Sequence, residues 1–484
     1  MSNLNRLGGA CGAGALAALA FAGLAFGQDA PASPIPAPAF DSGGTTWMMI
    51  SSVLVLAMTI PGLALFYGGL VRAKNMLSVL MQVSSILCLV AIIWVVYGYS
   101  MTFTDGGSLN AYVGGFSKMF LANVDFAGLD PTKGAATFSN GLYLPELVYI
   151  LFQMTFACIT PALIVGAVAE RVKFSGLMVF VALWVTIVYF PIAHMVWYWP
   201  GPDGVAAATL AGEEIRSGLI WGWGGLDFAG GTVVHINAGI AGLVLCLLIG
   251  KRLGFGKDAM PPHSLTLSMV GAAMLWIGWF GFNAGSNLAA DGIAALAAMN
   301  TFVATAAAAM GWVLVEWLTR GHPSLLGAIS GMVAGLVAVT PAAGFAGPIG
   351  AIVLGFVAGV ACFFFCTTVK NTFKYDDSLD VFGVHCIGGI IGAIGTAIVA
   401  DPGFTGQGWL DYAASPGTAV AGAYDLTAQL ITQAKAVGVT LVWSGLVSAV
   451  LYYVVHLTIG MRVTADQERE GLDISSHGER AYNS

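Results

Sequence analysis

Charged residues are scarce in this chain. Asp, Glu, Lys and Arg make up 9% of the 484 residues, whereas hydrophobic residues make up 57%. Soluble domains carry about a quarter charged residues, so this scarcity excludes an ordinary soluble protein and indicates an integral membrane protein. Only 18 residues are Lys or Arg, and they form no basic stripe, so we expect no nucleic-acid partner.

The sequence also offers no disulfide framework and no recognisable metal site. The seven cysteines lie in apolar segments, and no loop contains a pair. Cys362 and Cys366 share a helix face without an accompanying His or acidic cluster, so we interpret them as small core residues. No ring of carboxylates follows the apolar segments, which disfavours a channel for metal cations. We therefore expect no metal and no other cofactor.

The N-terminus is typical of a secreted or membrane protein. Residues 1–27 combine a basic start, an apolar run and a small-residue cleavage site, which predicts a signal peptide; a retained extra helix is the alternative. Residues 28–43 are rich in Pro, Ala and Ser and predict a disordered mature N-terminus. A membrane domain over residues 44–461 and a tail over residues 462–484 complete the predicted organisation.

Eleven apolar stretches are long enough to cross a bilayer, which requires about 20 residues. They predict an all-α polytopic fold, divided as five, five and one, in which the second five-helix repeat is inverted relative to the first. The predicted spans cover residues 45–71, 77–103, 142–169, 175–196, 226–250, 263–286, 291–318, 324–341, 346–369, 379–400 and 433–460.

The basic residues predict how the chain is oriented. Thirteen Lys and Arg residues fall on alternate connections, against four on the opposite ones. Because basic loops stay on the cytoplasmic side, we expect the N-terminus outside and the C-terminal tail in the cytoplasm. This orientation agrees with a cleaved signal peptide and with a multi-pass protein in the lipid bilayer of the cell (inner) membrane.

Two histidines, His235 and His385, lie inside apolar stretches that would otherwise be dry helix. An ionisable group at bilayer depth is costly and is therefore a functional candidate. Under the five-helix division both occupy the same position in their repeats, which predicts one shared site near the membrane midplane. A pore lining, a proton relay and a metal site all fit such a pair. A metal enzyme would need a third ligand, and none lies nearby in the sequence.

An aspartate precedes each histidine. Asp227 lies eight residues before His235, and Asp380 lies five before His385. On an ideal helix these offsets are about 80° and about 140°, so neither carboxylate stacks on its histidine. We interpret both as helix-start, structural or field-setting residues, with a direct proton relay as the less favoured alternative.

Aromatic residues share helix faces near the predicted outer ends. Phe152 and Phe156 are four residues apart, and Trp279, Phe282 and Ser286 follow one stripe. Aromatic faces attract small cations by about 0.5–2 kcal/mol, and a hydroxyl adds an acceptor. Core packing or an interfacial belt is the alternative reading.

An apolar path lined by imidazoles restricts what can cross it. A bare cation pays a large desolvation cost, whereas a cation that gives up a proton crosses as a neutral molecule. Imidazoles can hydrogen-bond to such a molecule and relay a proton. Physical chemistry therefore favours a small protonatable amine, with ammonium as the simplest case.

At these residues the chain resembles the ammonium transporter (Amt/Mep/Rh) family, from about residue 44 to the C-terminus. The segments that carry the resemblance are Phe152-Gln-Met-Thr-Phe156, Gly166-Ala-Val-Ala-Glu-Arg171, Asp227-Phe-Ala-Gly-Gly-Thr-Val-Val-His235, Trp279-Phe-Gly-Phe-Asn-Ala-Gly-Ser286 and Asp380-Val-Phe-Gly-Val-His385. The presence of both Trp197 and Ser286 favours the bacterial Amt branch.

The resemblance implies a homotrimer of eleven-helix protomers, each with its own pore for ammonium or ammonia and with methylammonium as a candidate second substrate. It implies a transporter rather than an enzyme. The implied roles are substrate recruitment by Phe156, Trp197 and Ser286 with Asp227 close by, a gate of Phe156 and Phe282 with Phe152 beside it, a pore lined by His235 and His385, and support from Asp380 and Trp279.

The tail resembles the cytoplasmic regulatory tail of the family over residues 471–482. This likeness implies a PII-type signalling protein as a partner. An ammonium sensor that signals through the tail is the alternative function, which the short tail disfavours. The connections 104–141, 198–225 and 401–432 are long and depart from the family pattern, and the resemblance says nothing about them.

Overall fold

The computed structural model describes residues 35–482. Within them, eleven helical spans are long and apolar enough to cross a membrane, the predicted number. We number them 1 to 11, and the predicted signal peptide lies outside the described residues. The spans are α2 to α3 (Ser42–Leu70), α4 to α5 (Ala73–Phe103), α6 (Glu146–Val168), α7 to α8 (Phe174–Trp197), η8 to α11 (Gly231–Ile249), α12 (Leu265–Gly285), α13 (Gly292–Arg320), α14 to η9 (Leu325–Ala342), α15 to α16 (Pro348–Phe373), η11 to α17 (Phe382–Val399) and α18 (Leu426–Thr458).

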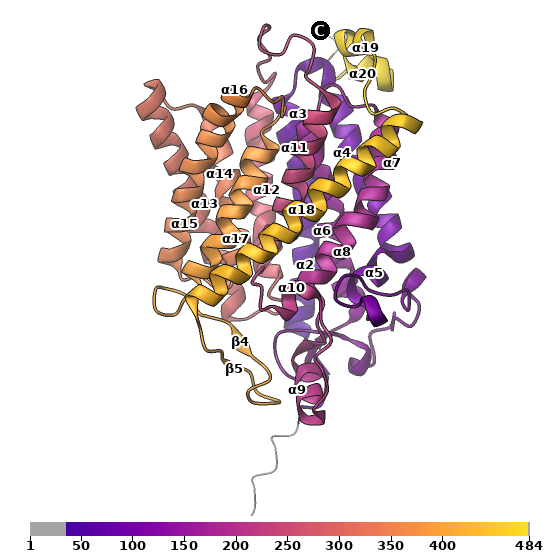
Figure 1. Ribbon diagram of the computed structural model, residues 1–484, viewed down its shortest axis with the longest axis vertical. Coiled ribbons are helices and arrows are strands. Elements are labelled where there is room, and N and C mark those ends of the chain that lie inside the picture. Colours follow the sequence, from indigo (N-terminus) through magenta and orange to yellow (C-terminus); the bar gives the residue numbers. More distant parts are fainter. Residues whose placement is uncertain (1–34, 483–484) are drawn as a thin grey trace, which may run out of the picture.

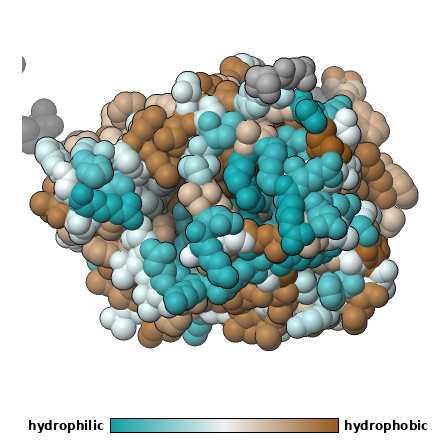
Figure 2. All heavy atoms as spheres, turned by 90° about the horizontal axis from the view of Figure 1, so that it is seen from above, coloured by the Kyte–Doolittle hydropathy of each residue, from teal (hydrophilic) through white to brown (hydrophobic). Residues whose placement is uncertain are grey.

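The two ends of the helix bundle differ (Figure 1). The C-terminal helices α19 (Ala465–Glu470) and α20 (Leu472–His477) lie at one end, which we call the tail end. The helix α9 (Gly201–Ala211) and the strands β4 (Leu410–Asp411) and β5 (Val420–Ala421) lie at the other, which we call the vestibule end. Hydrophilic residues gather over the tail end, whereas hydrophobic residues dominate its rim (Figure 2).

Two spans begin at residues that hydropathy alone does not find. Span 11, predicted from residue 433, begins at Leu426 because the Asp425 carboxylate caps it by accepting from the backbone N–H of Ala428. Its first turns contain polar residues, so a search for uninterrupted apolar stretches does not include them. Span 5, predicted from residue 226, begins at Gly231 because Gly230 has a φ of 118°, a conformation that suits glycine.

A small sheet orders part of the segment that the sequence predicts as disordered. Strand β1 (Ala39–Phe40) pairs with β3 (Leu142–Leu144), which also pairs with β2 (Ala135–Ala136). Asp41 then caps the first helix. Within the segment 28–43, the backbone groups of residues 39–41 find partners in the 104–145 connection, and residues 42 and 43 begin α2.

Spans 5 and 10 pack closely against each other. Neither Gly239 nor Gly389 could carry a Cβ without pressing on the partner span, at the backbone of Cys386 and the Cβ of His235 respectively. Small residues permit such close approach between membrane helices. Span 5 begins beside the vestibule and span 10 beside α16 (Lys370–Phe373) at the tail end, the antiparallel relation expected of inverted repeats.

Candidate functional site

The two histidines meet at the centre of the bundle. His235 lies in η8 (Gly231–Ile236) and His385 in η11 (Phe382–Cys386), the π-helical first turns of spans 5 and 10. Their Nδ1 atoms are 3.2 Å apart, and their rings stack with centroids 5.3 Å apart. Both side chains are buried. The structure thus brings together the pair that the repeat argument places at one site.

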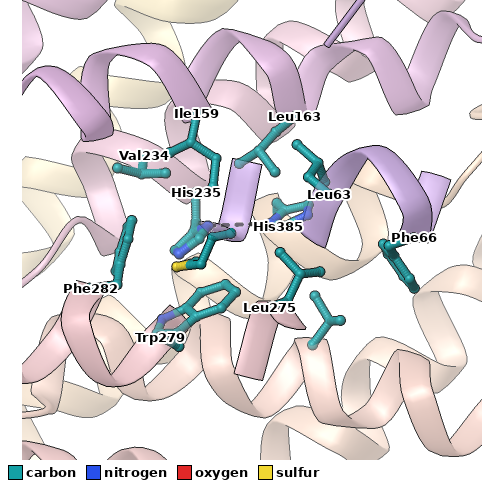
Figure 3. Close-up of a pocket in the computed structure, with 12 residues that line it drawn as sticks. Leu63, Phe66, Ile159, Leu163, Val234, His235, Leu275, Trp279, Phe282 and His385 are labelled. Atoms are coloured by element: carbon teal, nitrogen blue, oxygen red, sulfur yellow. Dashed lines mark hydrogen bonds between the residues drawn. The ribbon is translucent and has the colours of Figure 1, made fainter. Parts of the chain in front are cut away.

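A narrow cavity surrounds the pair (Figure 3). Its volume of about 10 Å³ is the room that about one water-sized molecule occupies. Phe282 and Phe66 lie on opposite sides of the two imidazoles. Apart from the histidines the lining is hydrophobic, and it consists of Met58, Leu63, Phe66, Ile159, Leu163, Val234, Leu275, Trp279, Phe282 and Val333.

Trp279 lies in this cavity. Its ring stacks on His235 with centroids 5.4 Å apart, and its indole N–H donates to the Thr340 hydroxyl over 2.9 Å. It therefore lies beside the histidines, whereas Ser286, seven residues further along the same helix, lines the vestibule. The stripe predicted from sequence connects two compartments.

Two stacked rings separate these compartments. Phe156 from span 3 and Phe282 from span 6 have centroids 4.2 Å apart and planes inclined by 24°. Phe152 packs edge-on against Phe156 at 4.9 Å, and Phe282 lies 6.1 Å from the His235 ring. Both stacked rings are 1% exposed, so they lie fully buried between the cavity and the vestibule.

A wide vestibule lies on the other side of the rings. Its volume is about 710 Å³, and Trp197, Ser286 and Asp227 are among the residues that line it. Trp197 packs edge-on against Phe156 at 5.8 Å and donates its indole N–H to the Asp227 carbonyl over 3.0 Å. The Ser286 hydroxyl donates to the Phe282 carbonyl over 2.8 Å, which leaves its oxygen lone pairs as acceptors.

The Asp227 carboxylate is the N-terminal cap of span 5. It accepts from the backbone N–H groups of Gly230, Gly231, Thr232 and Val233 at 2.8, 2.6, 2.8 and 3.2 Å, and from the Thr232 hydroxyl. Burial raises the pKa of Asp227, against the opposing effect of these hydrogen bonds. Both of its oxygens are engaged by these donors, so the carboxylate holds the first turn of η8 in place.

A second capping aspartate, Asp377, is absent from the residues predicted from sequence. Its Oδ2 accepts from the backbone N–H of Phe382 over 2.7 Å, at the start of span 10. Asp377 lies eight residues before His385, the same spacing as between Asp227 and His235. That repeated spacing is the signal that could have found it.

Asp380, predicted as a helix-start residue, forms an ion pair. Its carboxylate lies 2.6 Å from the Lys370 ammonium, and its backbone φ is 61°. Asp380 does lie at the start of span 10, where its backbone carbonyl accepts from the Val384 N–H over 2.9 Å, but the side-chain cap comes from Asp377. The structural and electrostatic part of the prediction agrees with the ion pair.

The Glu170-Arg171 segment of the sequence resemblance lies at the tail end, as does the C-terminal tail. Glu170 forms ion pairs with Arg72 and Arg252 at 2.7 and 3.0 Å. Burial acts to raise the pKa of Glu170, but the two arginines outweigh it and the pKa lies below its ordinary value. In the tail, Asp473 accepts from the backbone N–H of Ser78 over 2.8 Å, which docks α20 on the start of span 2.

This combination of a paired-histidine cavity, stacked rings and vestibule can be compared with known proteins. The family model described as Ammonium Transporter Family matches residues 46–482. The chain belongs to the ammonium transporter family. It is similar to the ammonium transporter of Bacillus subtilis (strain 168), with 42% identity over 443 residues that cover 91% of this chain and 98% of that protein.

Solved structures of this family share the fold. Candida albicans Mep2 superposes with a TM-score of 0.74 at 31% identity, covering 88% of this chain and 88% of that one. A structure named Sensor Amt Protein superposes with a TM-score of 0.76 at 24% identity, covering 90% and 98%, and it supports the fold alone. The transporter is thus a multi-pass membrane protein with the family's architecture over nearly its whole length.

Proposed function

We propose that this ammonium transporter recruits ammonium in the vestibule, removes its proton near the stacked rings, and conducts ammonia past the two histidines. The observation that carries this proposal is the cavity of about 10 Å³ in which two imidazoles are the polar groups. A bare ammonium ion would pay a large desolvation cost there, whereas ammonia pays far less. The cation therefore leaves its proton before it reaches the cavity.

The vestibule side of the rings fits a cation that donates hydrogen bonds. The rings of Trp197 and Phe156 meet edge to face, and the Ser286 oxygen offers an acceptor. Each aromatic contact contributes about 0.5–2 kcal/mol to cation binding, depending on desolvation. The Asp227 carboxylate behind Trp197 adds a negative field. Together these groups form the proposed recruitment site.

The hydrogen bond between the histidines gives the pore its chemistry. When one neutral imidazole donates from Nδ1, its Nε2 is an acceptor, and the other imidazole then carries its proton on Nε2. The pair thus offers one acceptor and one donor to a passing ammonia molecule. The Nε2 of His235 has no partner among the described residues, which suits this role.

We further propose the orientation and assembly that the sequence predicts. The tail end faces the cytoplasm of a cell whose inner membrane holds the transporter as a homotrimer, and the docked tail binds a PII-type signalling protein. Basic residues at the tail end, among them Arg72, Arg252 and Arg462, support the orientation. The trimer and the partner rest on family likeness.

Reconstituted protein tests the proposal directly. Proteoliposomes under an ammonium gradient should show saturable ammonium uptake above that of empty liposomes. The same proteoliposomes should not transport potassium. Simultaneous recording of current and internal pH then separates two routes for the proton. Current indicates that the proton follows along the histidines, and internal alkalinisation without current indicates that it returns to the vestibule side. Uptake no faster than in empty liposomes would overturn the proposed function.

A further inference from the structure

Four aromatic side chains form a wall in the vestibule, apart from the rings that separate it from the pore. We define the aromatic wall as Phe138, Trp199, Trp221 and Tyr412. Trp199 lies at its centre, with ring centroids 5.7 Å from Phe138, 5.3 Å from Trp221 and 5.2 Å from Tyr412. The Tyr412 hydroxyl also donates to the Phe138 carbonyl over 3.0 Å.

The aromatic wall joins three separate connections. Phe138 precedes span 3, Trp199 and Trp221 follow span 4, and Tyr412 follows span 10. All four side chains line the vestibule. Because the 104–141, 198–225 and 401–432 connections are the idiosyncratic parts of the sequence, the wall is a feature of this chain rather than part of the motifs described above.

The vestibule is far larger than ammonium requires. Its volume of about 710 Å³ lies within the range of about 300–1,000 Å³ typical of sites for drug-sized ligands. The cavity at the histidines, by contrast, has a volume of about 10 Å³. A ligand can therefore fill the vestibule and still be unable to pass the stacked rings.

The charged side chains that line the vestibule are all acidic. Asp227, Asp291, Asp411 and Asp425 line it, and no Lys, Arg or His does so among the residues that the structure describes. The last three carboxylates accept backbone N–H bonds from Ile293, Ala413 and Ala428 at 2.8, 2.9 and 3.0 Å. Four carboxylates held in place around one cavity attract cations and repel anions.

We propose that the vestibule binds a quaternary organic ammonium ion, with its N-methyl groups against the aromatic wall. The aspartates supply a negative field, and a quaternary ion, which has no N–H to donate, needs that field and aromatic faces but no hydrogen-bond acceptor. Aromatic faces recognise such ions through cation–π attraction. One ring of the lining, Trp223, already has an ammonium–aromatic contact, because the Nζ of Lys435, which does not itself line the cavity, lies 5.8 Å from its centroid.

Trp197 and Ser286 line the same cavity, so an ion bound there should hinder the access of ammonium to them. The binding itself does not rest on the proposed function, because a ligand in the vestibule need not be transported. Failure of uptake and failure of ligand binding are therefore separate results.

Calorimetric titration of the full chain with choline tests the proposal. The neutral isostere 3,3-dimethyl-1-butanol has the same shape without the charge and serves as the matched ligand. Choline should bind saturably, and the alcohol at least about tenfold more weakly, because it forms no cation–π contact. Equal binding of both, or no saturable binding of choline, would overturn the proposal.

Matched variants then locate the site. Trp199→Leu should weaken choline binding about tenfold, whereas Trp199→Phe, which keeps an aromatic face, should weaken it about threefold or less. Asp411→Asn keeps the backbone cap but loses the charge, and should weaken binding about threefold. Trp443→Leu, on span 11 and outside the cavity, serves as the control. Equal affinities in Trp199→Leu and Trp443→Leu would place the ion elsewhere and contradict the proposal.

Discussion

The two half-sites that hold the histidines share a plan and differ in detail. In each, an aspartate eight residues before the histidine caps the first turn of a span. Asp227 accepts four backbone N–H groups and a hydroxyl, whereas the carboxylate of Asp377 accepts the Phe382 N–H at Oδ2 and leaves Oδ1 without a partner among the described residues. The repeat therefore fixes where the histidines lie, while local contacts decide how firmly each is held.

The difference extends to the charge on the two caps. Burial raises the pKa of Asp377 to about 6, although the Lys370 ammonium acts in the opposite direction. Asp227 is also buried, but its carboxylate is compensated by donors on every side. The half-site at the vestibule thus has the more extensively hydrogen-bonded cap, and the half-site at the tail end contains a carboxyl whose burial raises its pKa to about 6.

The largest expected effect comes from Asp227→Ala. It leaves four buried N–H groups without an acceptor, so we expect a loss of at least about 3 kcal/mol of stability. Thermal unfolding in detergent measures this loss of stability. Asp227→Asn, which keeps one acceptor oxygen, is the matched variant. If Asp227→Ala unfolds at the wild-type temperature, the comparison between the half-sites fails.

An intermediate effect is expected at Thr232, whose hydroxyl donates to the Asp227 carboxylate. The equivalent residue of the second half-site is Phe382, which has no hydroxyl to donate. Thr232→Val keeps the shape and removes the hydrogen bond, for a cost of about 1–3 kcal/mol because the acceptor is charged. Thr396→Val, which removes a hydroxyl bonded to the Gly392 carbonyl elsewhere in span 10, is the control. We expect the melting temperature to fall further for Thr232→Val; the reverse order would argue against Asp227 as the principal anchor.

The smallest effect is expected at the other cap. At about pH 4, where Asp377 is protonated in the folded protein, Asp377→Asn should cost about 1 kcal/mol or less, because the amide oxygen can still accept the Phe382 N–H. A folded pKa above the ordinary value means that stability from the protonated carboxyl is lost as the pH rises through about 6. Wild type should therefore lose stability relative to Asp377→Asn between about pH 4 and about pH 7. A pH-independent difference in melting temperature would contradict the pKa asymmetry.

Much of the fold follows from the sequence because apolar length is decisive in a membrane. The hydropathy pattern alone predicts all eleven spans, and the five-helix periodicity predicts that His235 and His385 lie together, which agrees with the 3.2 Å between their Nδ1 atoms. The start of span 11 escapes such a pattern because its capping Asp425 and the polar Thr427 and Gln429 lower the mean hydropathy of its first turns.

Other parts of the site could not be predicted because they depend on contacts between distant segments. Asp380 is the nearer carboxylate in the sequence, and only the hydrogen bond to Phe382 identifies Asp377 as the cap. The aromatic wall joins residues from three loops that have no periodicity, so nothing in the sequence places Phe138 beside Tyr412. Geometry alone assigns these residues.

The central claim is that the paired histidines line the path of the substrate. Ammonium uptake into proteoliposomes by His235→Ala/His385→Ala, with protein amount and folding matched to wild type, tests it most directly. The account predicts that selective ammonia conduction is abolished, because the cavity then offers neither donor nor acceptor to a passing molecule. Uptake and selectivity equal to those of wild type would contradict it.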